Sequence, residues 1–183
     1  MKSKLFVIAA ATTFAGATFA AEPGFYIGAD IGASQQNINS ATPNSQNPTV
    51  GGVYGGYNFD KHFGIEANYY DFGKSRVDGQ SEVQTQLGGV DLVGRYAATD
   101  KLDLYGKFGL AYVNRKIDFA AGGDESKSGT AGKLGLGAEY AVAKNFGVRA
   151  EVAHYMGAPK FEGPGYEYKD NFTTFTVGAN YRF

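Results

Sequence analysis

The chain has 183 residues, a formal net charge of −1 and no cysteine, and it is rich in glycine (27), phenylalanine (14) and tyrosine (13). The balanced charge excludes a basic surface of the kind that holds nucleic acid, and the missing cysteines exclude a disulfide framework. The length suits one domain. Glycine beside so many aromatic residues, with only 5 prolines, is too regular for disorder and is typical of many curved strands.

Residues 1–20 have the three-part layout of a secretory signal peptide. Lys2 and Lys4 precede an apolar stretch at residues 5–17, and Thr18-Phe19-Ala20 places small residues at the two positions that signal peptidase reads. A membrane anchor is disfavoured, because the stretch is short and Glu22-Pro23-Gly24 follows at once. We therefore expect cleavage after Ala20, export, and a single domain at residues 21–183.

The rest of the chain predicts strands, because apolar and polar residues alternate in eight segments. Their predicted bounds are Phe25–Ala33, Val50–Phe59, Phe63–Phe72, Val83–Tyr96, Leu102–Ile117, Thr130–Val142, Phe146–Tyr155 and Phe172–Phe183. No apolar run after the signal peptide approaches the length of a membrane helix.

The connections between these segments alternate in length. Short ones lie at residues 60–62, 97–101 and 143–145, and longer ones lie at 34–49, 73–82, 118–129 and 156–171. This rhythm predicts an up-and-down sheet with its tight turns and both ends on one side. Strands of about ten residues cross a bilayer at a tilt, and only a closed barrel pairs every strand there. The predicted fold is therefore all-β, a transmembrane eight-stranded antiparallel β-barrel.

Each segment has one apolar face and one charged, glycine-rich face. The charged face carries six acids and five bases: Asp30, Glu66, Asp91, Arg95, Asp103, Lys107, Lys133, Glu139, Arg149, Glu151 and Arg182. We expect this face to line the lumen, where charges must be paired or hydrated. Glu66 and Arg149 lie at matching depths on the third and seventh strands, so they are predicted to meet. The balance of sign favours a plugged, salt-bridged interior over a pore of one sign.

A secreted barrel of the lipocalin type, with its apolar side chains inside, is the soluble alternative. Three features favour the membrane. The charged face is rich in glycine, aromatic residues such as Phe63, Tyr96 and Phe146 gather where strands meet short turns, and the chain ends in Phe183. The aromatic positions match an interfacial girdle, although tryptophan is absent.

On these residues the chain resembles the OmpA-type eight-stranded outer-membrane barrels and, less specifically, the small OmpX and Ail group. The resembling segments are Gly24–Ala29, Thr99–Gly109, Gly137–Val142, Val148–Glu151 and Tyr181–Phe183. The resemblance covers residues 21–183 apart from the loops. It implies residence in the outer membrane of a Gram-negative bacterium, in contact with its lipid and lipopolysaccharide.

The resemblance also implies an internal ion-pair network at Glu66, Glu139 and Arg149. The family's basic partner on the fourth strand falls near Val93 here, so Arg95 or Lys107 is expected to replace it, and Glu151 is expected to join the network. The last strand resembles the segment that the barrel-assembly machinery recognises after periplasmic chaperones deliver the chain, with an assembly set of Phe175, Val177, Ala179, Tyr181 and Phe183. OmpA itself continues into a peptidoglycan-binding domain, and we do not carry cell-wall anchoring over to this chain.

An enzyme is the rival class, because some small outer-membrane barrels modify lipid A. That chemistry needs a histidine base beside a serine nucleophile, with a carboxylate to orient the base. His62 falls in a predicted turn, and Glu151 lies on the opposite face of the strand from His154. The acidic pair Asp124-Glu125 has too few oxygens at fixed spacing for calcium. We expect no enzyme activity, no cofactor and no metal site.

The long connections are where a surface function would lie. Phe161, Tyr166 and Tyr168 are candidate surface contacts, or they fold back over the barrel mouth. The expected role is structural, supporting outer-membrane integrity and surface display of the loops. Two alternatives stay open: a narrow pore gated by the lumen salt bridges, and adhesion or host-factor binding through the loops.

Overall fold

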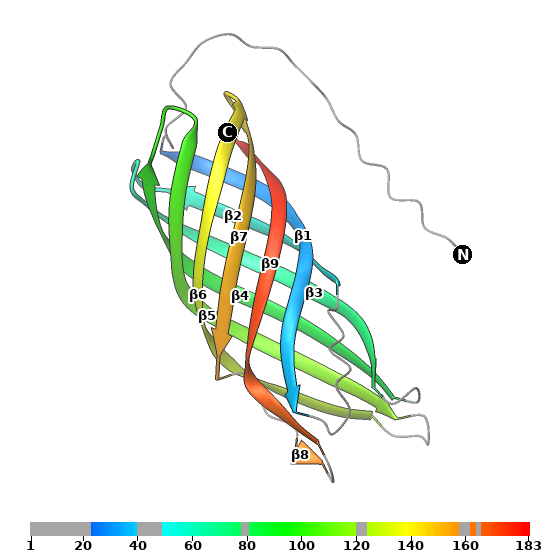
Figure 1. Cartoon of the computed structure of the whole chain (residues 1–183). Coiled ribbons are helices and arrows are strands. Elements are labelled where there is room, and N and C mark those ends of the chain that lie inside the picture. Colours follow the sequence, from blue (N-terminus) through cyan, green and yellow to red (C-terminus); the bar gives the residue numbers. More distant parts are fainter. Residues whose placement is uncertain (1–22, 40–48, 78–80, 120–123, 158–161, 164–165) are drawn as a thin grey trace, which may run out of the picture.

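The structure, a computed structural model, is a single β-sheet that closes on itself (Figure 1). It describes residues 23–39, 49–77, 81–119, 124–157, 162–163 and 166–183. Its strands are β1 (Gly24–Asn39), β2 (Thr49–Asn58), β3 (Phe63–Val77), β4 (Ser81–Ala97), β5 (Leu102–Phe119), β6 (Asp124–Ala143), β7 (Phe146–Met156), β8 (Glu162–Gly163) and β9 (Tyr166–Arg182). Strands β1 to β7 pair antiparallel in chain order, β7 pairs with β9, and β1 pairs with β9 to close the barrel. The short strand β8 pairs only with β9, so eight strands form the wall.

The eight predicted strands and the all-β barrel are confirmed. The strands run further toward the long connections than the alternation predicts: β6 begins at Asp124, inside the predicted connection 118–129, and β9 begins at Tyr166. The reason is visible in the register, where Ile117 still pairs with Glu125 across β5 and β6. Backbone hydrogen bonds hold the two strands together there, and these bonds form whether or not the side chains alternate between apolar and polar.

The start of β1, the C-terminus and the short turns lie at one end of the barrel (Figure 1). Phe183 N donates to Phe25 O at 3.0 Å, which joins the last residue to the first strand. The turn at residues 59–62 is held by Asp60, whose Oδ1 accepts from the backbone N of His62 (2.6 Å) and of Phe63 (2.8 Å).

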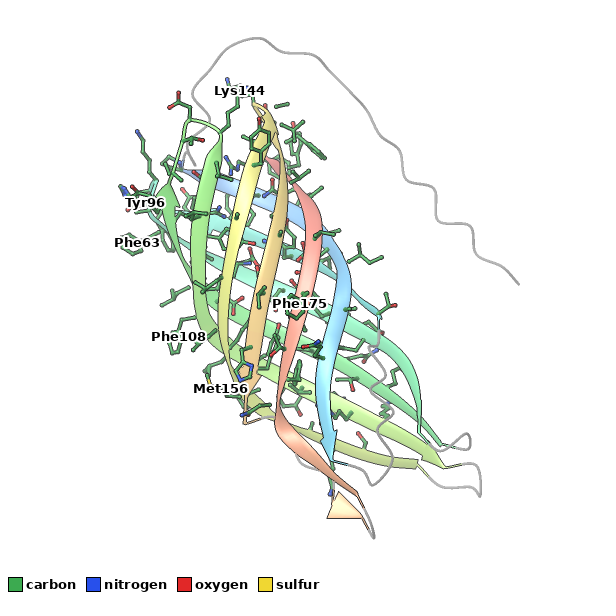
Figure 2. All side chains as sticks on the ribbon, in the orientation of Figure 1. Phe63, Tyr96, Phe108, Lys144, Met156 and Phe175 are labelled. Carbon is green, nitrogen blue, oxygen red and sulfur yellow. The ribbon has the colours of Figure 1, made fainter. Side chains whose placement is uncertain are left out.

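Most of the large apolar side chains point outward, as the membrane interpretation predicts. Figure 2 shows Phe63, Tyr96 and Phe108 standing away from the wall. Phe175 is 48% and Leu136 72% exposed, while Glu66 is fully buried. Strand β7 alternates between exposed and buried over its whole length. This polarity is the reverse of a lipocalin. The part of the chain that the structure describes contains no helix long and apolar enough to cross a membrane.

Glycine on the inward face makes room for tyrosine rings. A Cβ added at Gly28, Gly56 or Gly137 would collide with the ring of Tyr54, Tyr26 or Tyr105, respectively. The glycine content of the charged face therefore follows from packing, since large rings on neighbouring strands lie flat over positions that carry no side chain.

Candidate functional site: the barrel lumen

The lumen of the barrel contains the charged face predicted from the sequence. Acidic and basic side chains occupy alternate positions of their strands, so the pleat directs them all inward. Ten of the eleven predicted charged residues are at most 6% exposed, and the side chain of Arg182, at the short-turn end, is 14% exposed. The structure adds Arg115, which is 3% exposed and which the sequence reasoning missed. Among the side chains that the structure describes inside the barrel, Arg115 brings the charges to six acids and six bases, with Arg182 included.

A chain of ion pairs crosses the lumen at mid-height. Arg149 Nη2 lies 2.7 Å from Asp30 Oδ2, and its Nη1 lies 2.9 Å from Glu66 Oε2. Lys107 Nζ then links Glu66 Oε1 (2.7 Å) to Glu151 Oε2 (2.6 Å). The chain continues from Glu151 through Lys133 to Asp91, with Lys133 Nζ at 3.4 Å and 2.6 Å from the two carboxylates. Three cations therefore bridge four carboxylates, and we name these seven residues the central network.

A second group of charges lies nearer the short-turn end. Glu139 accepts from Arg95 Nη1 at 3.1 Å and contacts Arg182 Nη2, which also lies 3.6 Å from Asp103 Oδ2. Lys107 and Arg95 thus serve different carboxylates, and the position of Val93 carries no charge. Removing one partner from such buried groups leaves an uncompensated charge, which is the costly state.

Four buried tyrosines surround the central network, and the sequence reasoning did not single them out. Tyr26 donates to Glu66 Oε2 (3.1 Å), Tyr70 to Asp30 Oδ2 (2.7 Å) and Tyr105 to Glu151 Oε2 (3.2 Å). The fourth, Tyr54, lies under the Arg149 guanidinium, 3.1 Å from ring centroid to Cζ. Tyr26, Tyr70 and Tyr105 each lie an even number of positions from an inward charged residue of their own strand, and the sequence could have revealed this spacing.

Toward the long connections the lumen also holds a layer of apolar side chains, which the expectation of a salt-bridged interior did not include, beside the buried Arg115 and Thr85. The apolar layer consists of Val50, Tyr70, Phe72, Leu87, Ala111, Val113, Ala131, Ala153, Tyr155 and Phe172. The rings of Tyr155 and Phe172 stack with centroids 4.6 Å apart, and Phe72 meets Phe172 edge-on at 5.5 Å.

The other residues singled out in the sequence lie away from the lumen. The assembly set lies on the outward face at the end of the chain, with Phe175 48% and Phe183 71% exposed. His154 also faces outward, with its Nδ1 2.9 Å from Thr173 Oγ1. Phe161 is outside the described residues; Tyr166 and Tyr168 belong to β9, where only their backbone is described. No group of three His, Asp or Glu residues in the described part of the chain is placed to hold a metal ion.

A closed eight-stranded antiparallel barrel with an apolar outer band and a paired, charged interior defines the class of integral outer-membrane β-barrel proteins. The chain belongs to the family described as "Outer membrane protein beta-barrel domain", whose model matches residues 6–183. It is therefore an outer-membrane protein, embedded in the lipid of that membrane.

Curated relatives support this assignment. The chain is 32% identical to the 31 kDa outer-membrane immunogenic protein of Brucella melitensis over 73% of its length and 66% of the relative's length. It is 29% identical to Outer membrane protein P5 of Haemophilus influenzae, covering 93% of this chain and 53% of P5. The chain thus spans between about half and two thirds of the curated relatives that it matches.

Solved barrels share the fold. Neisserial surface protein A superposes with a TM-score of 0.69 at 16% identity, covering 87% of this chain and 97% of that one. OprG of Pseudomonas aeruginosa gives 0.64 at 14% identity, covering 88% and 97%. At these identities the likeness shows the architecture alone.

Proposed function

We propose that the chain is a closed structural barrel of the outer membrane, which supports membrane integrity and displays its long hairpins at the cell surface. One observation carries this proposal. Among the side chains that the structure describes, the central network fills one level of the lumen and the apolar layer fills another. An eight-stranded barrel has room inside for side chains and little more. The filled interior favours a scaffold over a transport channel.

A salt-bridge-gated pore is less well supported, because breaking ion pairs would open only one layer. Water and ions passing the central network would next meet the stacked rings of Tyr155 and Phe172. A hydrophobic constriction resists ion passage by dewetting. A pore would therefore require both layers to rearrange.

The proposal includes the absence of enzyme activity. A hydrolytic site needs a base oriented by a carboxylate on the same side of the wall. His154 faces outward beside Thr173, whereas Glu151 is buried in the lumen and paired with Lys107. The relatives reported above are named for their membrane location and not for a reaction.

Surface display rests on the length of the hairpins. Strands β5 and β6 stay paired as far as Asp118 and Asp124, although the β6–β7 ladder ends at Gly132 and Met156. The name of the Brucella relative, an immunogenic protein, is consistent with exposure of such hairpins. An epitope inserted between Phe119 and Asp124 is expected to bind antibody on intact cells. Binding only after lysis would contradict display.

Assembly partners form the last part of the proposal. The assembly set presents a row of apolar residues on the outward face, from Phe175 on β9 to the last residue, Phe183, which suits recognition by the barrel-assembly machinery. Periplasmic chaperones would carry the chain there, and lipopolysaccharide would border the exposed band at the outer surface.

Solute retention in proteoliposomes tests the scaffold role. Vesicles that contain the refolded barrel are expected to retain a small ion as long as empty vesicles do, with a heat-dependent gel shift as proof of folding. Cells that lack the protein are expected to take up more hydrophobic dye, and the wild-type gene is expected to restore the barrier. Fast leakage from the vesicles would contradict a closed barrel, and unchanged dye uptake would contradict a role in integrity.

A further inference from the structure

The lipid-facing wall has a gap at one cross-strand pair. Gly94 on β4 pairs with Gly106 on β5, and among the cross-strand pairs of the described strands this is the one made of two glycines. Both share the parity of outward residues, and a Cβ added at Gly94 would meet nothing within 4 Å. The wall is therefore bare backbone at this point.

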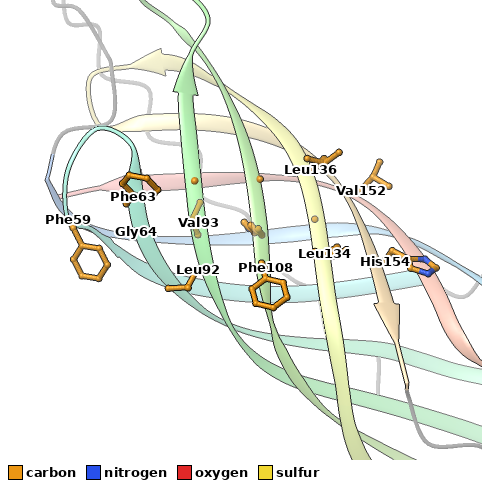
Figure 3. Close-up of a pocket in the computed structure, with 14 residues that line it drawn as sticks. Phe59, Phe63, Gly64, Leu92, Val93, Phe108, Leu134, Leu136, Val152 and His154 are labelled. Carbon is orange, nitrogen blue, oxygen red and sulfur yellow. The ribbon is translucent and has the colours of Figure 1, made fainter.

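Large side chains frame this bare patch on every side. Phe63 and Leu136 pair with the two glycines from the neighbouring strands, and Leu92 with Phe108 and Tyr96 with Leu104 form the rows on either side. All six are exposed, from 46% for Leu104 to 72% for Leu136. Figure 3 shows Phe63, Leu92, Phe108 and Leu136 on four adjacent strands around the hollow. We name this feature the glycine groove.

The groove is elongated. Two hollows, of about 700 Å³ and about 710 Å³, share Phe63, Gly94, Gly106 and Leu136, so they meet over the glycine pair. One hollow extends to His62 at the short-turn end and the other extends to His154 on β7. The lining is almost entirely apolar, and an extended apolar groove of this size fits one hydrocarbon chain.

The short-turn end of the groove is charged with both signs. His62 O accepts from Arg95 N at 2.7 Å, which holds the β2–β3 turn against β4 beside Gly94. That turn carries Asp60 and Lys61 as well, and the β4–β5 turn beyond Tyr96 carries Asp100 and Lys101, all exposed. A headgroup with a phosphate and an amine matches such a rim, with the lysines facing the phosphate and a carboxylate facing the amine.

We propose that the glycine groove binds one phospholipid of the periplasmic leaflet, with an acyl chain over Gly94 and Gly106 and an amine-bearing phosphate headgroup between the two turns. In lipid, packing rather than the hydrophobic effect drives such association, and small residues allow the close approach. A second barrel copy is the competing occupant. The presence of both signs of charge at the rim favours the lipid, because it is complementary to a zwitterionic headgroup.

Native mass spectrometry of the refolded full chain, released from nanodiscs of mixed phosphatidylethanolamine and phosphatidylglycerol, tests this proposal. The wild type is expected to retain one phosphatidylethanolamine. Gly94→Leu with Gly106→Leu fills the groove and is expected to lower the retained fraction at least about tenfold, or about 1.4 kcal/mol. Gly88→Leu is the matched control, since Gly88 also faces outward on β4 with nothing within 4 Å of an added Cβ.

The headgroup contribution is tested separately. Lys61→Ala with Lys101→Ala is expected to remove the preference for phosphatidylethanolamine while the gel shift shows an intact barrel. Equal retention by the filled and control variants would overturn the proposal, as would indifference to the headgroup in the wild type. A mass of two chains that the filled groove abolishes would also overturn it and would assign the groove to a second copy.

Discussion

Arg149 is the residue on which the central network depends most, and Arg149→Met tests this directly. Methionine keeps an unbranched side chain and removes the charge. Arg149 donates to Asp30 through Nε (3.1 Å) and Nη2 (2.7 Å), and to Glu66 through Nη1 (2.9 Å). After the substitution, Glu66 keeps Lys107 and Tyr26, whereas Asp30 keeps only the hydroxyl of Tyr70 among the contacts of the described residues.

The expected loss follows from this stranded carboxylate. Removing one partner of a buried ion pair costs about 3–5 kcal/mol of unfolding free energy. The double variant Arg149→Met with Asp30→Asn removes the stranded charge and is expected to lose less than the sum of the single losses, with a coupling of about 1–3 kcal/mol. Lys101→Met, in an exposed turn, is the control and is expected to stay within about 0.5 kcal/mol of wild type.

Urea unfolding of the refolded barrel in detergent micelles, followed by circular dichroism, measures these differences. The denaturant slope should be the same in all variants, so that midpoints report stability. A loss below about 1 kcal/mol for Arg149→Met, or strict additivity in the double variant, would refute the reasoning.

Three further predictions concern a packed glycine, the last residue and the first turn. Gly137→Ala is expected to destabilise by about 1–3 kcal/mol, because its methyl would collide with Tyr105 in a packed lumen; equal urea midpoints for Gly137→Ala and wild type would contradict this. Phe183→Ala is expected to reduce the folded barrel in cell envelopes while the refolded protein keeps its stability, and an unchanged envelope yield would remove the residue from assembly. The backbone N–H groups of His62 and Phe63 hold the pKa of the Asp60 carboxyl below its ordinary 3.8. Because the folded-state pKa is the lower one, the stability that this carboxylate contributes is present above the ordinary pKa and lost as the pH falls through the folded pKa. Wild type and Asp60→Asn should therefore differ in urea midpoint at pH 7. The two midpoints should converge once the pH falls below the folded-state pKa of Asp60.

Much of the fold is readable from the sequence because a strand in a membrane barrel has a strict period of two. Each residue faces either lipid or lumen, so the parity of Leu134 and Leu136 against that of Lys133 predicts the wall and its direction. The short connections predict the antiparallel order. The hairpin extensions, such as residues 124–129 on β6, could not be predicted, because these residues are polar or glycine and show no apolar alternation, and their pairing rests on backbone hydrogen bonds.

The sequence predicts which residues face the lumen but not which of them form ion pairs with one another. Parity predicts that Glu66, Lys107 and Glu151 share the interior. That Lys107 bridges the two acids depends on the stagger of strands around the barrel, which no local pattern encodes. The apolar layer was missed for a different reason. Val50, Leu87 and Phe172 are assigned to the inward face only when the alternation of each strand is continued to its end at the long connections.

The central claim is that two layers, one charged and one apolar, close the lumen, and single-channel recording in planar bilayers tests it most directly. Four chains are compared: wild type, Glu66→Gln in the central network, Tyr155→Ala with Phe172→Ala in the apolar layer, and all three substitutions together. A heat-dependent gel shift verifies that each barrel is folded. The account predicts silence from the first three and discrete current steps from the combined variant alone. Steps from wild type, or from Glu66→Gln by itself, would contradict it.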